Sequence, residues 1–423
     1  MERTKPSSLA VQIASFVFTR WVVNIQVRMF YPFLAVFARG LGISLADISL
    51  AVMARGFVGA TMPFLAPLAD RYGRRVGILL GLGLFIASNT LVVALPTLPT
   101  FFLSVCFSMV GVFLVISSIQ AHIGDAVPYP RRGLAIALTE LGWSLSFILG
   151  MPLVAYLLAR AGWRAPFRLA VGMGVAAFLL LCRVLPASGQ VSSTSTDGPD
   201  DLLQKHSQSP GGAESQTHRS LGLANLRLVL ASPAARAALV IGLAFTAANE
   251  VVNLVFGVWM EDSFGLNILA LGIASTVIGF SELAGEGLTA SLVDRVGKER
   301  SIRIGLVLNG LFALVLPWLG RSGLAGALAG LFLFYLSFEF SVVSMLPLMT
   351  EILPEARATL MGVNVAAYAL GRALGAFLAP RLYLLGFRAN VLAALVFDII
   401  SILLLSRVCL THKASQELIS TVE

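Results

Sequence analysis

Charged residues are scarce in this sequence of 423 residues, of which Asp, Glu, Lys and Arg make up 12%. A soluble globular chain carries about a quarter of its residues charged. Hydrophobic residues reach 57% and the mean hydropathy is +0.87, so the composition excludes a soluble enzyme. Because one membrane-spanning helix needs roughly 20 mostly apolar residues, this hydrophobic content corresponds to about twelve spans.

Cysteine is also rare, and its three positions exclude two further kinds of site. Cys106, Cys182 and Cys409 lie far apart in or beside apolar stretches, which predicts neither a disulfide framework nor a metal site. The net charge is +8, but Lys and Arg are dispersed between apolar blocks, whereas a nucleic-acid binder clusters them on one solvated face. No GxxxxGK(S/T) phosphate loop occurs. We therefore expect no metal, no cofactor, no nucleic-acid partner and no ATP hydrolysis.

The hydrophobic residues gather into two sets of six blocks, separated by a polar segment. The predicted spans lie near residues 10–38, 46–69, 76–96, 100–123, 134–158, 166–187, 234–260, 267–290, 302–320, 324–350, 359–385 and 389–409. The segment between the sets begins SGQVSSTST and is rich in Ser, Gly and Gln, so we expect an unstructured linker. The sequence therefore predicts an all-α membrane protein of twelve transmembrane helices, with an N-terminal six-helix bundle at 1–187, a cytoplasmic linker at 188–233 and a C-terminal six-helix bundle at 234–423.

The distribution of Lys and Arg between the loops predicts the orientation. Short loops on the side of both termini are rich in basic residues, among them Arg74, Arg75, Arg131 and Arg132, whereas loops on the other side carry few. Positive loops stay in the cytoplasm, so we expect cytoplasmic termini in a multi-pass protein of a bacterial plasma (inner) membrane. No cleavage site follows the first apolar block, so we expect the first span to be retained.

Two loops recur at matched places in the two sets of spans. Asp70, Arg71 and Gly73 in the loop LADRYGRR (68–75) return between the eighth and ninth spans as Asp294, Arg295 and Gly297, with the same spacing. The loops DAVPYPRRG (125–133) and EILPEARAT (351–359) also match, each giving an acid, a proline and an arginine before the next span. Such repetition indicates a duplicated six-helix unit whose two copies face the same way across the membrane.

The repeated loop also predicts a contact between the two halves at their inner face. Glycine at positions 73 and 297 suits a tight turn with a left-handed backbone. An Asp at the end of one span can accept hydrogen bonds from the free N–H groups at the start of another helix. We expect Asp70 to contact the start of the eleventh span and Asp294 the start of the fifth, with a loop that only fixes topology as the alternative. The residues of this conformational latch are Asp70, Arg71, Gly73, Arg74, Asp294, Arg295 and Gly297.

These loops resemble the signature of the major facilitator superfamily. That signature reads roughly G-x-L-A-D-R-x-G-R-(K/R), and LADRYGRR fits it, with Ala66 and Ala290 in place of its first glycine. GMP at 150–152 resembles the Gly-Pro motif of the family's efflux antiporters, and GWRAPF at 162–167 resembles the entry to the sixth span in many bacterial members. The resemblance implies two pseudo-symmetric six-helix bundles around a central cavity, with the third, sixth, ninth and twelfth helices outside.

Ten ionisable residues lie inside the predicted spans, where each would cost about 2.5–3.5 kcal/mol at mid-helix. They must therefore face water or one another. Polar residues share helix faces, as Arg20, Asn24, Arg28 and Tyr31 do, which predicts one hydrated central cavity, with fixed structural ion pairs as the alternative. Asp398, on the twelfth span, is the exception to this pattern. The predicted substrate and proton cavity comprises Arg20, Asn24, Arg28, Tyr31, Arg55, Glu140, Glu250, Asn253, Glu282, Glu286, Glu339, Tyr368 and Arg372.

The carboxylates are the candidates for carrying protons, because arginine keeps its proton in any plausible environment. Glu282 and Glu286 lie one helical turn apart and repel each other when both are ionised, so one of them is expected to retain a proton. This pair is the first candidate for proton coupling, and Glu250 and Glu339 follow.

The sequence therefore predicts a secondary active transporter that moves a small organic solute by rocking of its two halves. We expect coupling to protons, a lipid bilayer as surroundings, a monomer, and efflux slightly favoured over uptake because of the partial Gly-Pro motif. The alternatives are an uptake symporter or uniporter of the same fold and a non-transporting membrane sensor. No HExxH or GxSxG motif supports an intramembrane enzyme.

Overall fold

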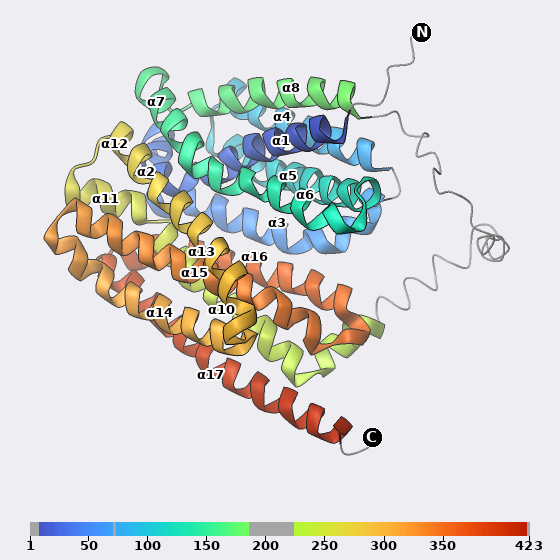
Figure 1. Ribbon diagram of the computed structural model, residues 1–423. Helices are drawn as coiled ribbons and strands as arrows, with labels where there is room; N and C mark the ends of the chain where they lie inside the picture. Colours follow the sequence, from blue (N-terminus) through green and yellow to red (C-terminus); the bar gives the residue numbers. More distant parts are fainter. Residues whose placement is uncertain (1–7, 71–72, 186–223, 421–423) are drawn as a thin grey trace, which may run out of the picture.

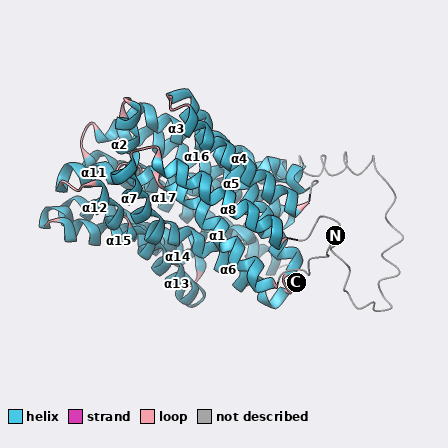
Figure 2. Ribbon diagram, turned by 90° about the horizontal axis from the view of Figure 1, so that it is seen from above, coloured by secondary structure: helices cyan, strands magenta, loops and turns pink. Residues whose placement is uncertain are grey.

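The computed structural model describes residues 8–70, 73–185 and 224–420, with the side chains of residues 64–70, 129–130 and 408–420 excepted. All regular elements in these ranges are helices (Figure 2). Twelve of the helical segments described are long and apolar enough to cross a membrane. The predicted fold class, an all-α membrane protein of twelve transmembrane helices, is confirmed.

The first half of the chain forms the upper body in Figure 1. Its elements are α1 (Leu9–Arg28), α2 (Phe30–Leu41), α3 (Leu45–Asp70), α4 (Arg74–Ala94), α5 (Leu98–Ala126), α6 (Tyr129–Leu145), the π-helical turn η1 (Ser146–Gly150), α7 (Met151–Ala161) and α8 (Ala165–Val184).

The second half forms the lower body in Figure 1. Its elements are α10 (Pro233–Asn253), α11 (Phe256–Phe264), α12 (Ile268–Ala274), α13 (Thr276–Val296), α14 (Lys298–Leu319), the short 3-10 turns η4 (Gly320–Ser322) and η5 (Pro354–Ala356), α15 (Leu324–Ile352), α16 (Arg357–Tyr383) and α17 (Phe387–Ser420). The start of α1 and the end of α17 lie at the same end of the molecule, which we call the terminal end.

The first span of each half is broken into two helices. The chain between α1 and α2 turns at Met29, and α2 bends again at Phe33 (φ −113°, ψ 18°). Pro32 explains why the helix is interrupted here, because proline has no backbone N–H to donate to a carbonyl oxygen of the preceding turn. In the second half, α10 ends at Asn253 and α11 begins at Phe256. The predicted span near 10–38 is thus two helices with a turn at Met29, and the predicted span near 234–260 is found with a short break at residues 254–255.

Glycines with left-handed backbone recur at matched positions in the two halves. Gly42 and Gly265 end α2 and α11 with φ 69° and 63°. Gly73 and Gly297, in the repeated loops, have φ 85° and 90°, as expected for a turn that only glycine adopts easily. Gly162 and Gly386, each in the turn before the last span of its half, have φ 76° and 96°. The duplication predicted from two loops therefore extends to the backbone of three turns.

The carboxyl end of the predicted linker is a helix rather than an unstructured chain. Residues 224–231 are helical, and Val229 is fully buried among the side chains of α10 and α15. The sequence ANLRLVL (224–230) contains enough apolar residues to bury one face of this helix. The rest of the linker, residues 188–223, lies outside the described residues.

Several pairs of helices join the two halves. Midway along the molecule α3 packs against α16, where a Cβ on Gly56 would lie 2.8 Å from the Cβ of Ala373, and α13 packs against α6 and η1. At the end opposite the termini, α2 packs against α11 and α7 against α12. There a Cβ on Gly257 would clash with the carbonyl oxygen of Pro32, so only glycine permits this approach.

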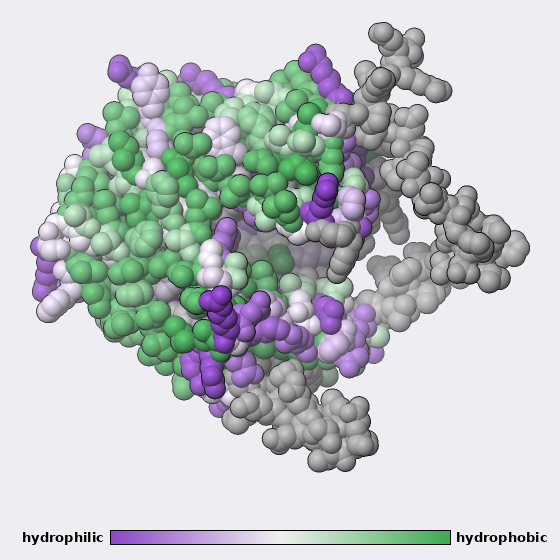
Figure 3. Space-filling model, in the orientation of Figure 1, coloured by the Kyte–Doolittle hydropathy of each residue, from purple (hydrophilic) through white to green (hydrophobic). Residues whose placement is uncertain are grey.

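Hydrophobic side chains lie on the outside of the molecule, and a hollow lies between its halves (Figure 3). Hydrophobic side chains cover the outer surface of both halves, as a bilayer requires. Between the halves the molecule is hollowed toward the terminal end. The halves are thus in contact at the opposite end and apart at the terminal end.

Candidate functional site: a charged cavity between the halves

A cavity of about 320 Å³ lies between the two halves and takes its wall from both. Its lining residues come from α1, α2 and α6 of the first half and from α10, α13, α15 and α16 of the second. They are Arg28, Tyr31, Glu140, Trp143, Asn249, Glu250, Asn253, Glu282, Glu286, Tyr335, Phe338, Glu339, Val342 and Arg372. Five carboxylates and two guanidinium groups therefore face one space.

An ion pair joins the halves inside this cavity. The guanidinium group of Arg28 on α1 donates two hydrogen bonds to the carboxylate of Glu282 on α13, Nη1 to Oε2 at 2.8 Å and Nη2 to Oε1. The side chains are 3% and 8% exposed, so the pair is almost fully removed from solvent. Buried bidentate pairs of this kind are strongly oriented. Arg28 is the last residue of α1, on the helix face that also carries Arg20 and Asn24.

Aromatic rings and a backbone carbonyl hold the Arg28 guanidinium group in place. Its Cζ lies 4.1 Å from the ring centroid of Trp143 and 3.8 Å from that of Phe147. Its Nη1 also donates to the carbonyl oxygen of Trp143 at 3.2 Å. The serine at position 146 begins the π-helical turn that follows Trp143 on the same span. A cation between two ring faces and a carboxylate is stabilised on each side.

A second ion pair lies within the first half. Arg20 on α1 donates to Glu140 on α6 through both terminal nitrogens, at 2.6 and 2.5 Å. Gln120 on α5 donates to the same carboxylate at 3.4 Å. Arg20 is buried, whereas the side chain of Glu140 is 38% exposed toward the cavity. Glu140 therefore lines the cavity with a carboxylate whose negative charge is already balanced by the buried Arg20.

The remaining arginines surround Glu250 on α10. Arg55 on α3 donates to the carbonyl oxygen of Val27 at 2.7 Å and to the Tyr31 hydroxyl at 3.2 Å. The charges nearest to the Glu250 carboxylate are those of Arg372 and Arg55, and Tyr31 lies beside it. Glu250 is 1% exposed, and its Oε1 has no hydrogen-bond partner among the described residues. This carboxylate is thus matched in charge but not fully satisfied in hydrogen bonding.

Three carboxylates gather where α13 meets α15. Glu282 and Glu286 lie one turn apart on α13, and Gly285 between them packs on Glu339 of α15, so that a Cβ there would lie 2.8 Å from the Glu339 Cβ. Each of the three is within electrostatic range of the other two. Glu282 is paired with Arg28, whereas Glu286 and Glu339 form no ion pair among the described residues. Two surplus carboxylates therefore stand next to the pair that joins the halves.

Most residues predicted for the cavity line it, and four stand behind its wall. Arg20 donates hydrogen bonds to Glu140, and Arg55 donates one to the Tyr31 hydroxyl. Asn24 is 1% exposed inside the first half. Tyr368 packs edge-on against Phe245, with ring centroids 5.3 Å apart. The predicted list lacks five lining residues, Trp143, Asn249, Tyr335, Phe338 and Val342. Phe338 and Val342 had no polar group to mark them. They lie on the α15 face that carries Tyr335 and Glu339, one or two helical turns along it, and this periodicity was the available signal.

The repeated loops form matching ion pairs within each half at the terminal end. Arg74 Nε lies 3.0 Å from Asp125 Oδ2, at the end of α5. In the second half Lys298 forms an ion pair with Glu351, at the end of α15. Asp294 and Arg295 are exposed, and Asp294 forms no side-chain hydrogen bond or ion pair among the described residues. The side chains of Asp70 and Arg71 lie outside the described residues.

The geometry defines a class of protein before any comparison. Twelve membrane-spanning helices form two repeated halves that meet midway and at one end, with a charged cavity between them. This arrangement is that of a membrane transport protein. The described residues hold no cluster of His, Cys, Asp or Glu suited to a metal ion.

Comparison with known proteins agrees. The sequence model described as Major Facilitator Superfamily matches residues 16–376 and 238–418. The chain belongs to the major facilitator superfamily, and it is a multi-pass membrane transport protein.

Individual relatives are distant but cover most of the chain. An uncharacterized MFS-type transporter of Bacillus subtilis (strain 168), YwfA, is 25% identical over 357 residues, which are 83% of this chain and 80% of that protein. The inner membrane transport protein YdhP of Escherichia coli (strain K12) is 25% identical over 349 residues, 81% of each chain. The crystal structure of a D-xylose-proton symporter superposes with a TM-score of 0.73 at 15% identity, over 95% of this chain and 97% of that one. These relatives are transporters rather than enzymes, as the sequence predicted.

Proposed function

We propose that the protein is a proton-coupled secondary transporter that exports a small organic solute, preferably a cationic one, by rocking of its two halves. The observation that carries this proposal is the Arg28–Glu282 pair, which joins the halves inside the cavity beside two carboxylates that have no ion-pair partners among the described residues. A fixed charge pair between two rigid bodies is a contact that protons and solute can both disturb.

The surplus of negative charge favours cations and protons as ligands. Five carboxylates line the cavity against two guanidinium groups, and Arg20 and Arg55 behind the wall reduce the imbalance without removing it. In a space with little water each unmatched charge is costly, so Glu286 and Glu339 gain from a proton or from a solute cation. Trp143, Tyr335 and Phe338 supply faces on which an organic cation can stack.

Competition for the same carboxylates favours exchange in opposite directions. A proton bound at Glu286 or Glu339 removes the charge that would hold a cation, so the two ligands are not bound together. Protonation of Glu282 would also weaken its pair with Arg28 and release one contact between the halves. Proton entry then coincides with solute release, which is the logic of an efflux antiporter.

The membrane placement follows from charge and from relatives. We propose an inner-membrane location with both termini in the cytoplasm, because the basic residues of the repeated loops lie at the terminal end and YdhP is an inner membrane protein. In that orientation the cavity of this conformation faces the cytoplasm, the side from which an exporter loads. A monomer suffices, because one chain supplies the whole lining.

We further propose that the conformational latch forms when the terminal end closes. Asp294 stands exposed at the end of α13, and the start of α6 belongs to the other half. Rocking would bring them together, and Asp70 would meet the start of α16 in the same way. Asp294→Asn should then slow solute release without changing solute binding in the conformation open at the terminal end. Equal loss of binding and release would contradict this assignment.

The proposal is tested in proteoliposomes that contain a pH-sensitive dye. Ethidium, benzoate and glucose serve as cationic, anionic and neutral probes, and the ligand is chosen by the rise in unfolding temperature. We expect wild-type protein to couple ethidium movement to proton flux. Glu282→Gln and Glu286→Gln should lose this coupling while exchange of labelled ethidium down its gradient survives, and Glu299→Gln on α14 serves as the control. Wild-type coupling in both variants would reject the carboxylates as proton carriers, and an absence of counterflow with every ligand would favour a sensor.

A further inference from the structure

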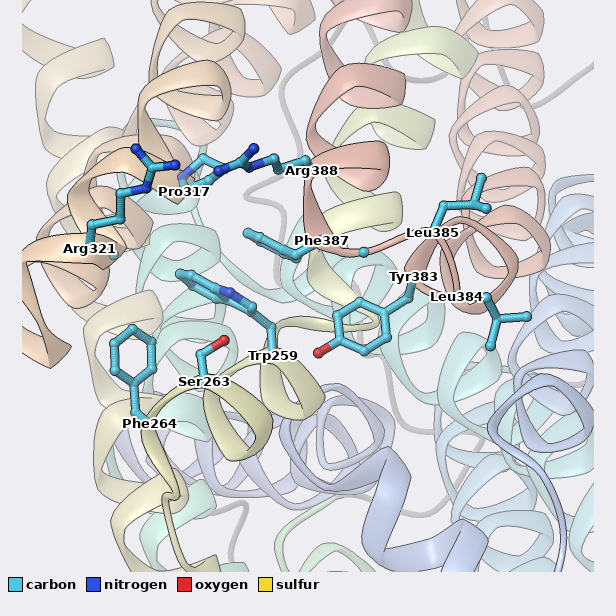
Figure 4. Close-up of a pocket in the computed structure, with 12 residues that line it drawn as sticks. Trp259, Ser263, Phe264, Pro317, Arg321, Tyr383, Leu384, Leu385, Phe387 and Arg388 are labelled. Atoms are coloured by element: carbon cyan, nitrogen blue, oxygen red, sulfur yellow. The ribbon is translucent and has the colours of Figure 1, made fainter.

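A second cavity lies at the end of the molecule opposite the termini, entirely within the second half (Figure 4). It has a volume of about 620 Å³ and lies between α11, the corner of α14 and η4, and the turn from α16 to α17. None of its lining residues belongs to the central cavity, so it has no part in the transport site described above.

The floor of this cavity is a rigid aromatic platform. The rings of Trp259 on α11 and Phe387 on α17 are stacked, with centroids 4.1 Å apart and an angle of 7° between planes. Phe264 meets Trp259 edge-on at 5.6 Å. Gly386, with φ 96°, turns the chain so that Phe387 points inward at the start of α17. Two separate segments, α11 and the start of α17, thus form the platform.

Two arginines converge at the rim of the cavity. Arg321 on η4 and Arg388 on α17 point toward one another across Pro317 (Figure 4). Among the described residues neither forms an ion pair or a hydrogen bond through its side chain. The nearby acids of α11 are already engaged, Glu261 with Arg39 at 2.9 Å and Asp262 with the Tyr383 hydroxyl at 2.7 Å. Two like charges held together without an acid are stabilised when an anion sits between them.

Apolar side chains flank the same rim. Leu384 and Leu385, in the turn before α17, are 84% and 79% exposed, and Trp318 at the end of α14 is 74% exposed. Such exposure of large apolar residues beside tryptophan and arginine is typical of the boundary between headgroups and acyl chains. The cavity therefore offers cations, an aromatic face and an apolar edge in one place.

We propose that this cavity binds one anionic phospholipid. Its phosphate is bound between Arg321 and Arg388, since a guanidinium group matches two phosphate oxygens. Its glycerol backbone lies over the Trp259–Phe387 platform, and its acyl chains run along Leu384 and Leu385 into the bilayer. A free phosphate ion could bind between the same two arginines, but it would leave the apolar edge uncovered. A phospholipid covers both, and this difference distinguishes the lipid from free phosphate.

The test uses purified full-length protein in neutral detergent, titrated with dioctanoyl phosphatidylglycerol, dioctanoyl phosphatidylcholine or inorganic phosphate. We expect phosphatidylglycerol to bind one molecule per chain, roughly 30-fold tighter than phosphatidylcholine, about fivefold for each arginine. It should also raise the unfolding temperature. Millimolar phosphate should not displace it.

Variants separate the site from general attraction to anionic lipid. R321Q/R388Q should bind phosphatidylglycerol no better than phosphatidylcholine, whereas R321K/R388K should keep part of the preference. Arg160, an exposed arginine on α7, provides the matched control, and R160Q should bind as wild type. Unchanged phosphatidylglycerol affinity in R321Q/R388Q overturns the proposal. Displacement by phosphate, or phosphate binding of equal strength, overturns the lipid assignment.

Discussion

The two halves of this protein repeat each other in backbone but not in charge. Left-handed glycines recur at three matched turns, and each half ties its repeated loop to the end of a later span by an ion pair, Arg74–Asp125 in one and Lys298–Glu351 in the other. Inside the membrane the first half holds mainly arginines and the second mainly carboxylates. Duplication thus supplies the scaffold, and the transport site depends on where the copies differ.

Individual positions make the difference concrete. When the halves are aligned on their matched loops at 125–133 and 351–359, Glu140 corresponds to Ala366, Glu339 to Phe113, and Arg372 to Ser146. Ala366 and Ser146 are buried and uncharged, whereas Glu140 and Arg372 line the cavity. The same helix position therefore supports packing in one copy and carries a cavity charge in the other. Because opposite charges lie on facing halves, their attraction acts across the boundary between the halves.

The largest effect is expected from breaking the Arg28–Glu282 ion pair, which joins an arginine of the first half to a carboxylate of the second. Arg28→Ala leaves the buried Glu282 carboxylate without its cation, which should lower the free energy of unfolding by about 3–5 kcal/mol and abolish transport. Arg28→Met combined with Glu282→Leu removes both charges and should recover most of the stability without recovering transport. Urea titration of purified protein measures the first quantity and proteoliposome flux the second. Similar stability of Arg28→Ala and wild type would show that the pair is not formed.

A smaller and more selective effect is expected at Glu339. Glu339→Gln removes one of the two surplus carboxylates while keeping the shape of the side chain, so solute-driven proton flux should fall to background and labelled-solute exchange should continue. Stability should not fall, because the residue has no ion-pair partner to orphan among the described residues. Flux of protons and of solute are measured in the same vesicles. Proton flux at the wild-type rate would remove Glu339 from the coupling site.

The sequence predicted the scaffold better than the site because the two depend on different information. Span length and apolar content set the twelve helices, and the repeated loops set the duplication. Which charges pair depends on how helices are rotated and where they break. The sequence paired Glu282 with Glu286 along one helix, whereas the fold brings Arg28 and Glu339 to Glu282 from α1 and α15. The pairing of Arg28 with Glu282 depends on which helices of the two halves face each other, and the periodicity of a single helix does not report this.

A moderate effect is expected at the turns that the halves share. Gly73→Ala and Gly297→Ala place a Cβ on left-handed backbone, which should cost about 1–2 kcal/mol at each position. Because the two turns have nearly the same φ, the two losses should be alike. Gly83→Ala, at a helical glycine with no atom within 4 Å of the added Cβ, is the control and should be neutral or stabilising. Unequal losses at Gly73 and Gly297 would show that the two turns share a backbone conformation but do not contribute equally to the free energy of unfolding.

The smallest effect is expected from the ion pairs at the terminal end, which lie within each half rather than between the halves. Arg74→Gln and Lys298→Gln each remove one partly exposed pair, which should change stability by about 0–1 kcal/mol and less at high salt. These pairs lie within one half each, so their loss should leave the relative position of the halves, and solute binding in this conformation, unchanged. Arg28→Ala, by contrast, should alter both. If Lys298→Gln impaired transport as strongly as Arg28→Ala, coupling would reside in the repeated loops rather than in the unmatched charges of the cavity.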